Sequence, residues 1–168
     1  MLLKFVKVID TVNEWFGRVA SLLGYLLFII VVVGVFFRKV LNHPFIWNFE
    51  ASYMSYAAMF LLGLGYTLKH KMHVTIDVIY AAVGPKVQLA LDILGFVLFL
   101  IPFAYVSLKS TTIFTIQSWQ ILEHSQSTWA PPIYPFKTLM PISFAMLVLQ
   151  AIAELIKSIY TKGKGQEI

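Results

Sequence analysis

The chain has 168 residues, of which 59% are hydrophobic and 12% charged, with a formal net charge of +5 and no cysteine. Soluble domains carry about 25% charged residues, so this composition indicates a membrane protein with short loops and no separate soluble domain. The missing cysteines exclude disulfides, thiolate metal sites and dithiol redox chemistry. The lysines and arginines flank the apolar stretches and form no basic face, which argues against a nucleic-acid partner and suits contact with membrane lipids.

Residues 1–18 place apolar side chains at helical spacing between polar ones. The apolar positions are Leu2, Phe5, Ile9, Val12 and Phe16. No small-residue cleavage site follows, so we do not expect a cleavable signal peptide. The pattern predicts an amphipathic segment, which is either a helix lying in the membrane interface or an extension of the first span.

Four stretches contain no charged residue, namely residues 19–37, 51–68, 93–108 and 138–153. A helix needs about 20 mostly apolar residues to cross a bilayer core of about 30 Å, and these stretches reach that length with their apolar flanks. We therefore predict an all-α integral membrane fold, a single domain over residues 1–168. Its four transmembrane helices are expected at about residues 19–41, 50–69, 87–115 and 136–158.

The third span belongs to a longer region with few helix breakers. Between Val87 and Trp119 the strongest breaker is Pro102, and a helix of that length exceeds the bilayer core. We expect this helix to tilt or project from the membrane and to kink at Pro102.

The distribution of lysine and arginine predicts that both termini are cytoplasmic. With that orientation nine basic residues lie inside: Lys4, Lys7, Arg18, Lys69, Lys71, Lys86, Lys157, Lys162 and Lys164. Four lie outside: Arg38, Lys39, Lys109 and Lys137. Short cytoplasmic loops are the ones enriched in these residues. Arg38 and Lys39 run against the trend, and they either snorkel to the outer head groups or serve a partner.

The uncharged stretches offer nothing on which membrane enzymes or pumps depend. Ionisable groups at depth hold the proton, ion or nucleophile in such proteins. The histidines here, His43, His70, His73 and His124, all fall in loops or at helix ends, where they cannot form a transmembrane haem site. We therefore predict that the chain is not an enzyme and has no catalytic residue, metal or cofactor.

Two polar loop clusters remain as candidate sites. His70, His73 and Asp77 are too few for a zinc site of ordinary composition, and we interpret them as an interfacial patch that fixes a loop or meets a partner. Trp119, Glu123, His124 and Trp129 form either a docking site or a solvated turn beside an aromatic belt.

Five short motifs occur in order along the chain. They are Trp47-x-x-Glu50, Gly63-x-Gly65-Tyr66-Thr67-Leu68, His73-Val74-x-x-Asp77-Val78, Ser118-Trp119-x-x-x-Glu123-x-Ser125 and Trp129-Ala130-Pro131-Pro132-Ile133-Tyr134-Pro135. Together with the four-span layout they resemble the small membrane subunit (DctQ-like) of tripartite ATP-independent periplasmic (TRAP) transporters.

The resemblance implies a multi-pass protein of the bacterial inner membrane that takes part in sodium-driven uptake of organic anions. The substrates of such transporters are carboxylates such as keto or hydroxy acids, dicarboxylates or sialic acid, delivered by a periplasmic binding protein. A large elevator-type membrane subunit holds the ion and substrate sites, and the small subunit braces it. Residues expected at the subunit interface or in structural roles are Arg38, Trp47, Glu50, Gly63, Gly65, His73, Asp77, Trp119, Glu123, Trp129 and Pro132.

The alternative is a self-sufficient small transporter or channel that works as a homo-oligomer. It would need a deep acidic residue or a polar stripe along a pore. Neither is visible in the four uncharged stretches.

Single-cysteine labelling tests the predicted topology, and the native chain contributes no background thiol. With cytoplasmic termini, an impermeant thiol reagent added to intact cells should label Ser125→Cys but not Lys71→Cys. The reverse pattern would show that the orientation is wrong.

Overall fold

The computed structural model describes residues 2–70 and 84–163, and the regular elements in those ranges are helices. They are α1 (Leu2–Lys39), α2 (Asn48–Lys69), α4 (Pro85–Leu94), the π-helical segment η1 (Gly95–Leu100), α5 (Ile101–Gln120), α6 (Tyr134–Lys137), α7 (Leu139–Ser158) and the π-helical segment η2 (Ile159–Gly163). An isolated backbone bridge pairs His124 with Pro132. The predicted patch of His73 and Asp77 lies outside the described residues.

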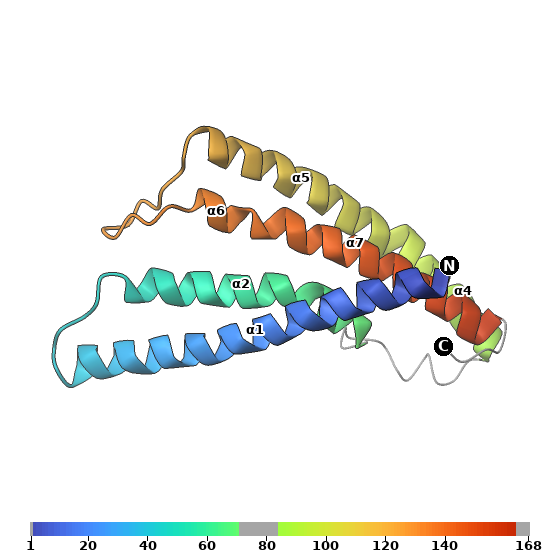
Figure 1. Ribbon diagram of the computed structural model, residues 1–168, viewed down its shortest axis with the longest axis horizontal. Coiled ribbons are helices and arrows are strands. Elements are labelled where there is room, and N and C mark those ends of the chain that lie inside the picture. Colours follow the sequence, from blue (N-terminus) through green and yellow to red (C-terminus); the bar gives the residue numbers. More distant parts are fainter. Residues whose placement is uncertain (1, 71–83, 164–168) are drawn as a thin grey trace.

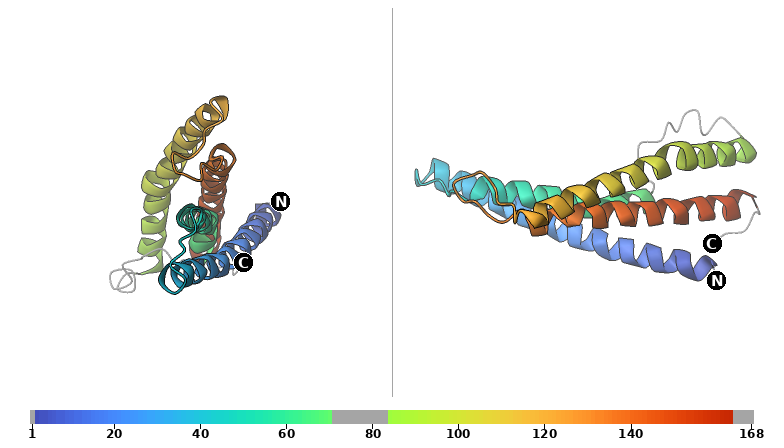
Figure 2. Two further views of the ribbon diagram at one scale, coloured as in Figure 1. Left: turned by 90° about the vertical axis from the view of Figure 1, so that its left-hand side faces the viewer. Right: turned by 90° about the horizontal axis from the view of Figure 1, so that it is seen from above.

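The helices form two antiparallel hairpins, α1 with α2 and α5 with α7 (Figure 1). α2 and α7 also pack on each other, so they lie in the middle of the bundle with α1 and α5 on the outside (Figure 2). The start of α1 and the end of α7 meet at what we call the terminal end, and residues 40–47 and 121–133 lie at the opposite, loop end. The main apolar core joins Leu68 of α2, Ala104 of α5 and Leu147 and Ala151 of α7.

Three helical stretches are long and apolar enough to cross a membrane: Lys4–Lys39, Val87–Gln120 and Tyr134–Thr161. The predicted all-helical fold is therefore confirmed for the described residues, with three candidate membrane spans. α2 is not among them, because its tyrosines, serines and glycines lower its apolar character. Its crossing of the membrane stays a prediction.

The N-terminal segment is continuous with the first span, since α1 runs unbroken from Leu2 to Lys39. Val6 and Ile9 are buried against Ala153 and Ile156 of α7. The face that the sequence pattern marked as apolar shares Ile9 with this one but is otherwise rotated from it, and Phe5 and Val12 on it are 47% and 37% exposed. The segment therefore packs on α7 in the structure, with part of its predicted apolar face uncovered.

The third long helix contains the irregularity expected near Pro102, but as a π-helical segment that precedes the proline. Helical structure runs from Pro85 to Gln120, with residues Gly95–Leu100 in π-helical form. The N–H of Ile101 donates to the carbonyl of Phe96, five residues earlier. Proline lacks an N–H and its ring clashes with the carbonyl four residues before it, so a wider turn at this point accommodates Pro102.

Glycines let α1 and α2 approach closely. A Cβ built on Gly17 would lie 2.2 Å from the Tyr66 ring, and one on Gly65 would lie 2.0 Å from Oδ1 of Asn13. Side chains at these positions would push the two helices apart, which is the usual reason for glycine between membrane helices. Gly63 differs, because a Cβ there meets no atom within 4 Å.

The two neighbouring glycines of α2 provide a matched test. Gly65→Ala should displace Asn13 and destabilise the chain by about 1–3 kcal/mol, the usual cost of overpacking. Gly63→Ala should be neutral or stabilising by up to about 1 kcal/mol, because alanine is the better helix former. Thermal unfolding in detergent would compare them, and equal midpoints would contradict the close approach at Gly65.

Candidate functional site

Buried polar side chains gather at both ends of the bundle. At the terminal end the central group is Gln150 of α7, whose side chain is fully buried. Its Nε2 donates to Oδ1 of Asp10 at 2.9 Å and to Oε1 of Glu154 at 3.0 Å. Its Oε1 accepts a hydrogen bond from Nδ2 of Asn13 at 2.7 Å. One amide thus joins two residues of α1 to α7.

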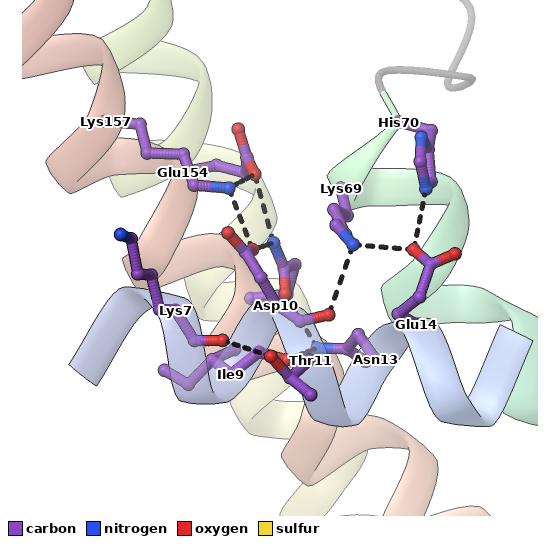
Figure 3. Close-up of polar contacts among 11 residues, drawn as sticks. Lys7, Ile9, Asp10, Thr11, Asn13, Glu14, Lys69, His70, Glu154 and Lys157 are labelled. Atoms are coloured by element: carbon purple, nitrogen blue, oxygen red, sulfur yellow. Dashed lines mark hydrogen bonds and ion pairs between the residues drawn. The ribbon is translucent and has the colours of Figure 1, made fainter. Parts of the chain in front are cut away.

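A lysine completes this terminal-end network (Figure 3). Nζ of Lys157 lies 2.8 Å from Oδ1 of Asp10 and 2.7 Å from Oε1 of Glu154. Gln150, Glu154 and Lys157 follow one another at intervals of four and three, which places them on one face of α7. Buried charges are tolerated only when they are paired and hydrogen-bonded, and this network meets that condition.

The end of α2 attaches to the same part of α1. Nζ of Lys69 donates to the Glu14 carboxylate at 2.6 Å and to the backbone carbonyl of Asp10 at 3.2 Å. Nε2 of His70 lies 3.2 Å from the same Glu14 oxygen (Figure 3). These contacts hold the α1–α2 hairpin together at the terminal end.

At the loop end a buried lysine is the central group. Lys137, at the end of α6, is 8% exposed, and its Nζ lies 2.5 Å from the Glu123 carboxylate and 3.9 Å from the centre of the Phe114 ring. Thr115 of α5 donates to the Lys137 carbonyl at 3.1 Å. The hydrogen bond from Lys137 holds the pKa of the Glu123 carboxyl below its usual value of 4.5.

The 121–133 loop that carries Glu123 is folded back on itself. The N–H of Glu123 donates to the carbonyl of Ser118 at 3.0 Å and that of Leu122 to Trp119 at 3.3 Å, the Schellman pattern of a helix C-terminus. Leu122 takes the left-handed conformation, with φ of 47°, where glycine is usual. Further on, the N–H of Ile133 returns to the carbonyl of Glu123 at 2.9 Å.

The loop is tied to α2 through Glu50, one of the predicted site residues. Its carboxylate accepts a hydrogen bond from the Ser125 hydroxyl. In the described part of the chain, Oε2 of Glu50 and Oδ1 of Asn48 are buried and have no hydrogen-bond donor. A cleft of about 210 Å³ opens beside Glu50, between α2 and the start of α7. Asn48 packs against Gly34 of α1, whereas Glu50 lines the cleft. Native proteins rarely leave buried acceptors unsatisfied, so the cleft beside Glu50 suits a donor from another molecule.

The remaining predicted residues have separate environments. Trp119 donates through its Nε1 to the Thr138 hydroxyl at 3.0 Å, and Trp47 stacks on Phe45 at a centroid distance of 5.3 Å. Arg38 and Trp129 are exposed, and Pro132 forms the bridge with His124. At the loop end lie Trp47 of the first loop, Glu123, Trp129 and Pro132 of the second, and Glu50, which contacts the second loop through Ser125. Gly65 lies beside Asn13 of the terminal-end network.

Sequence reasoning did not find the terminal-end network. Asp10, Asn13 and Glu14 lie on the polar side of the predicted amphipathic segment, and Gln150 lies near the end of the last charge-free stretch. A usable signal was the spacing of Gln150, Glu154 and Lys157 on one face of an otherwise apolar helix. Within residues 2–70 and 84–163, no group of three or more His, Cys, Asp or Glu side chains is placed to hold a metal ion.

The described residues thus form a small, all-helical chain with three helices long and apolar enough to cross a membrane, the class of helical membrane proteins. Residues 27–161 match the family model described as "Tripartite ATP-independent periplasmic transporters, DctQ component". The match covers more than half of the chain, so the protein belongs to the DctQ family, a family of transporter components, as predicted. Comparison with curated proteins and with solved structures gave no match.

The loop-end lysine gives a pH-dependent prediction. Because the folded pKa of Glu123 lies below 4.5, its contact with Lys137 stabilises the fold above that value, and the contribution is lost as the pH falls through the lowered pKa. Glu123→Gln should therefore lower the thermal midpoint at neutral pH, and the difference from the parent should shrink in acid. A constant difference at all pH values would contradict this.

The double variant Glu123→Gln with Lys137→Gln is the control. It removes the buried ammonium that the single variant leaves without a carboxylate, so it should recover part of the lost midpoint. If the thermal midpoint of the double variant falls by the sum of the decreases in Glu123→Gln alone and Lys137→Gln alone, the two side chains are not coupled.

Proposed function

We propose that this chain is the small scaffold subunit of a sodium-driven TRAP transporter that imports organic anions from a periplasmic binding protein. The carboxylate substrate and the coupling ion bind to the large membrane subunit, and this chain braces that subunit's stationary part. The chain is a multi-pass protein of the bacterial inner membrane. It acts without catalysis and without a cofactor.

The observation that carries the proposal is that ionised side chains at both ends of the bundle pair with one another. At the terminal end Lys157 and Gln150 each bind both Asp10 and Glu154, and at the loop end Glu123 binds Lys137. These groups hold helices together and are not free to replace the hydration of a moving ion or carboxylate. A transporter that worked alone would need such free groups near the membrane centre.

The uncovered apolar surface supports a role in assembly. Only 6% of the most apolar window of the Val87–Gln120 helix is buried within the chain, and 11% of that of Lys4–Lys39. Phe99 and Phe103 on the first of these helices are 74% and 60% exposed. Lipid can cover such a surface, and so can the helices of a large membrane partner.

The corner at Glu50 supplies a polar complement to that apolar surface. Among the described residues, Oε2 of Glu50 in the first turn of α2 is a buried acceptor without a donor, and Glu50 lines the loop-end cleft. We infer that a donor from the large subunit or from the binding protein meets it. On this view the loop end carries the polar part of the docking surface.

α2 is proposed as the fourth span. It is 22 residues long, about 33 Å at about 1.5 Å per residue, which matches a bilayer core of about 30 Å. It lies antiparallel to α1, with Glu50 near one end and Lys69 at the other (Figure 1). With four crossings both ends of the chain lie on one side of the membrane, and the charge distribution makes that side cytoplasmic.

Reconstitution tests the proposal directly. Liposomes with a sodium gradient, a cognate binding protein and a panel of carboxylates should take up substrate only when the large subunit is present together with this chain. Vesicles that hold the large subunit alone should transport poorly, and vesicles that hold this chain alone should not transport. Saturable uptake by vesicles that hold this chain alone would contradict the proposal and support a homo-oligomeric transporter.

A further inference from the structure

A cleft of about 400 Å³ lies between the first half of α1 and the end of α2 at the terminal end. It is lined by Lys7, Asp10, Thr11, Glu14, Trp15, Arg18 and Lys69. Lys7, Thr11, Trp15 and Arg18 follow at intervals of four, four and three, so they form one face of α1. The side chains of Lys7 and Arg18 are exposed.

The carboxylates of this cleft are paired within the chain, although Asp10 shares the ammonium of Lys157 with Glu154. Asp10 is held by Lys157 and Gln150, away from the cleft's cations, and Glu14 is held by Lys69 and His70. In the described ranges, Lys7 and Arg18 have no carboxylate or other acceptor for their charged groups. In Figure 3 Lys7 extends away from the network, and only its backbone carbonyl is engaged, by the Thr11 hydroxyl at 2.8 Å. The cleft therefore presents two unpaired positive charges.

The position of the cleft matches the head-group layer of a membrane. Arg18 directly precedes the charge-free stretch of residues 19–37, so the cleft sits where the apolar span begins. Trp15, which lines it, is 63% exposed, and tryptophan is enriched at that depth. Past Arg18 the same face continues with exposed apolar side chains, Leu22 at 66%, Tyr25 at 71% and Ile29 at 57%.

We propose that this cleft binds an anionic phospholipid, with its head group along the face between Lys7 and Arg18 and an acyl chain along Leu22, Tyr25 and Ile29. The unpaired charges select an anion, and guanidinium and ammonium groups are the usual phosphate donors in proteins. The apolar continuation of the same face distinguishes a lipid from a free phosphate ion. This site requires only that the chain lies in a membrane, so it stands independently of the transport proposal.

The test is native mass spectrometry of the full-length chain in detergent, titrated with phosphatidylglycerol. One Lys or Arg contributes roughly fivefold to binding of an anionic lipid surface, so Lys7→Gln with Arg18→Gln should weaken binding by roughly twenty-five-fold. The matched control is Lys39→Gln with Lys109→Gln, which removes the same charge from exposed positions outside the cleft. The control should change the affinity less than twofold.

Further measurements distinguish an anionic lipid from a zwitterionic lipid and from free phosphate. Phosphatidylcholine should bind at least tenfold more weakly than phosphatidylglycerol, and millimolar inorganic phosphate should not displace the lipid. Lipid with brominated acyl chains should quench the fluorescence of the parent more than that of Trp15→Phe, which places the lipid at the cleft. Equal affinities for the two lipids, or displacement by phosphate, would overturn the proposal.

The thermal midpoint of each variant shows whether weaker lipid binding results from unfolding. The exchanged side chains make no contact that holds helices together, so the thermal midpoint of the glutamine variant should equal that of the parent. The charge-reversed variant, Lys7→Glu with Arg18→Glu, should abolish binding of phosphatidylglycerol at an unchanged midpoint. Binding that is equally weak in the Lys39/Lys109 control, or undiminished in the Lys7/Arg18 variants, rejects the site.

Discussion

The amide of Gln150 has to be satisfied inside the protein, because its side chain is fully buried and no water reaches it. That requirement brings Asn13 and Asp10 of α1 to α7. Asn13 can occupy its place only because Gly65 of α2 has no side chain there. With α2 so close, Lys69 reaches Glu14. The arrangement of three helices at the terminal end thus follows from one buried polar group.

At each end of the bundle a lysine with little solvent exposure is stabilised by contact with carboxylates. Lys157 is held by carboxylates of α1 and α7, and Lys137 is held by a carboxylate of the 121–133 loop and by the Phe114 ring. The Lys157 contacts join α1 to α7, which are distant in the sequence, whereas the Lys137 contacts join α6 to the loop before it and to α5. The middle of the bundle, around Ala104, Leu147 and Ala151, packs without charge. The ionised groups therefore serve cohesion of the chain, which fits a subunit whose partner performs the ion chemistry.

The sequence was sufficient for the features that depend on local composition. Charge-free stretches predicted apolar helices, Pro102 predicted an irregular third helix, and the ordered motifs around Trp47, Trp119 and Pro132 predicted the family. It was not sufficient where a residue's role depends on a distant neighbour. Gly63 and Gly65 look alike in the sequence, and only the position of Asn13 distinguishes them. The Gln150 network was missed because its partners lie near the other end of the chain.

The unbroken course of α1 has a consequence for how the protein sits in its bilayer. Its 38 residues extend for about 57 Å at about 1.5 Å per residue, whereas a bilayer core is about 30 Å thick. The charge-free residues 19–37 alone extend for about 28 Å at about 1.5 Å per residue, so the polar first half of α1 projects from the core or α1 tilts. Since α1 is clamped to α7 through Asp10 and Asn13, it cannot change its tilt alone. Membranes of different thickness should therefore reorient the bundle as a unit, which makes the thickness of the bilayer a variable that sets the angle of the whole subunit.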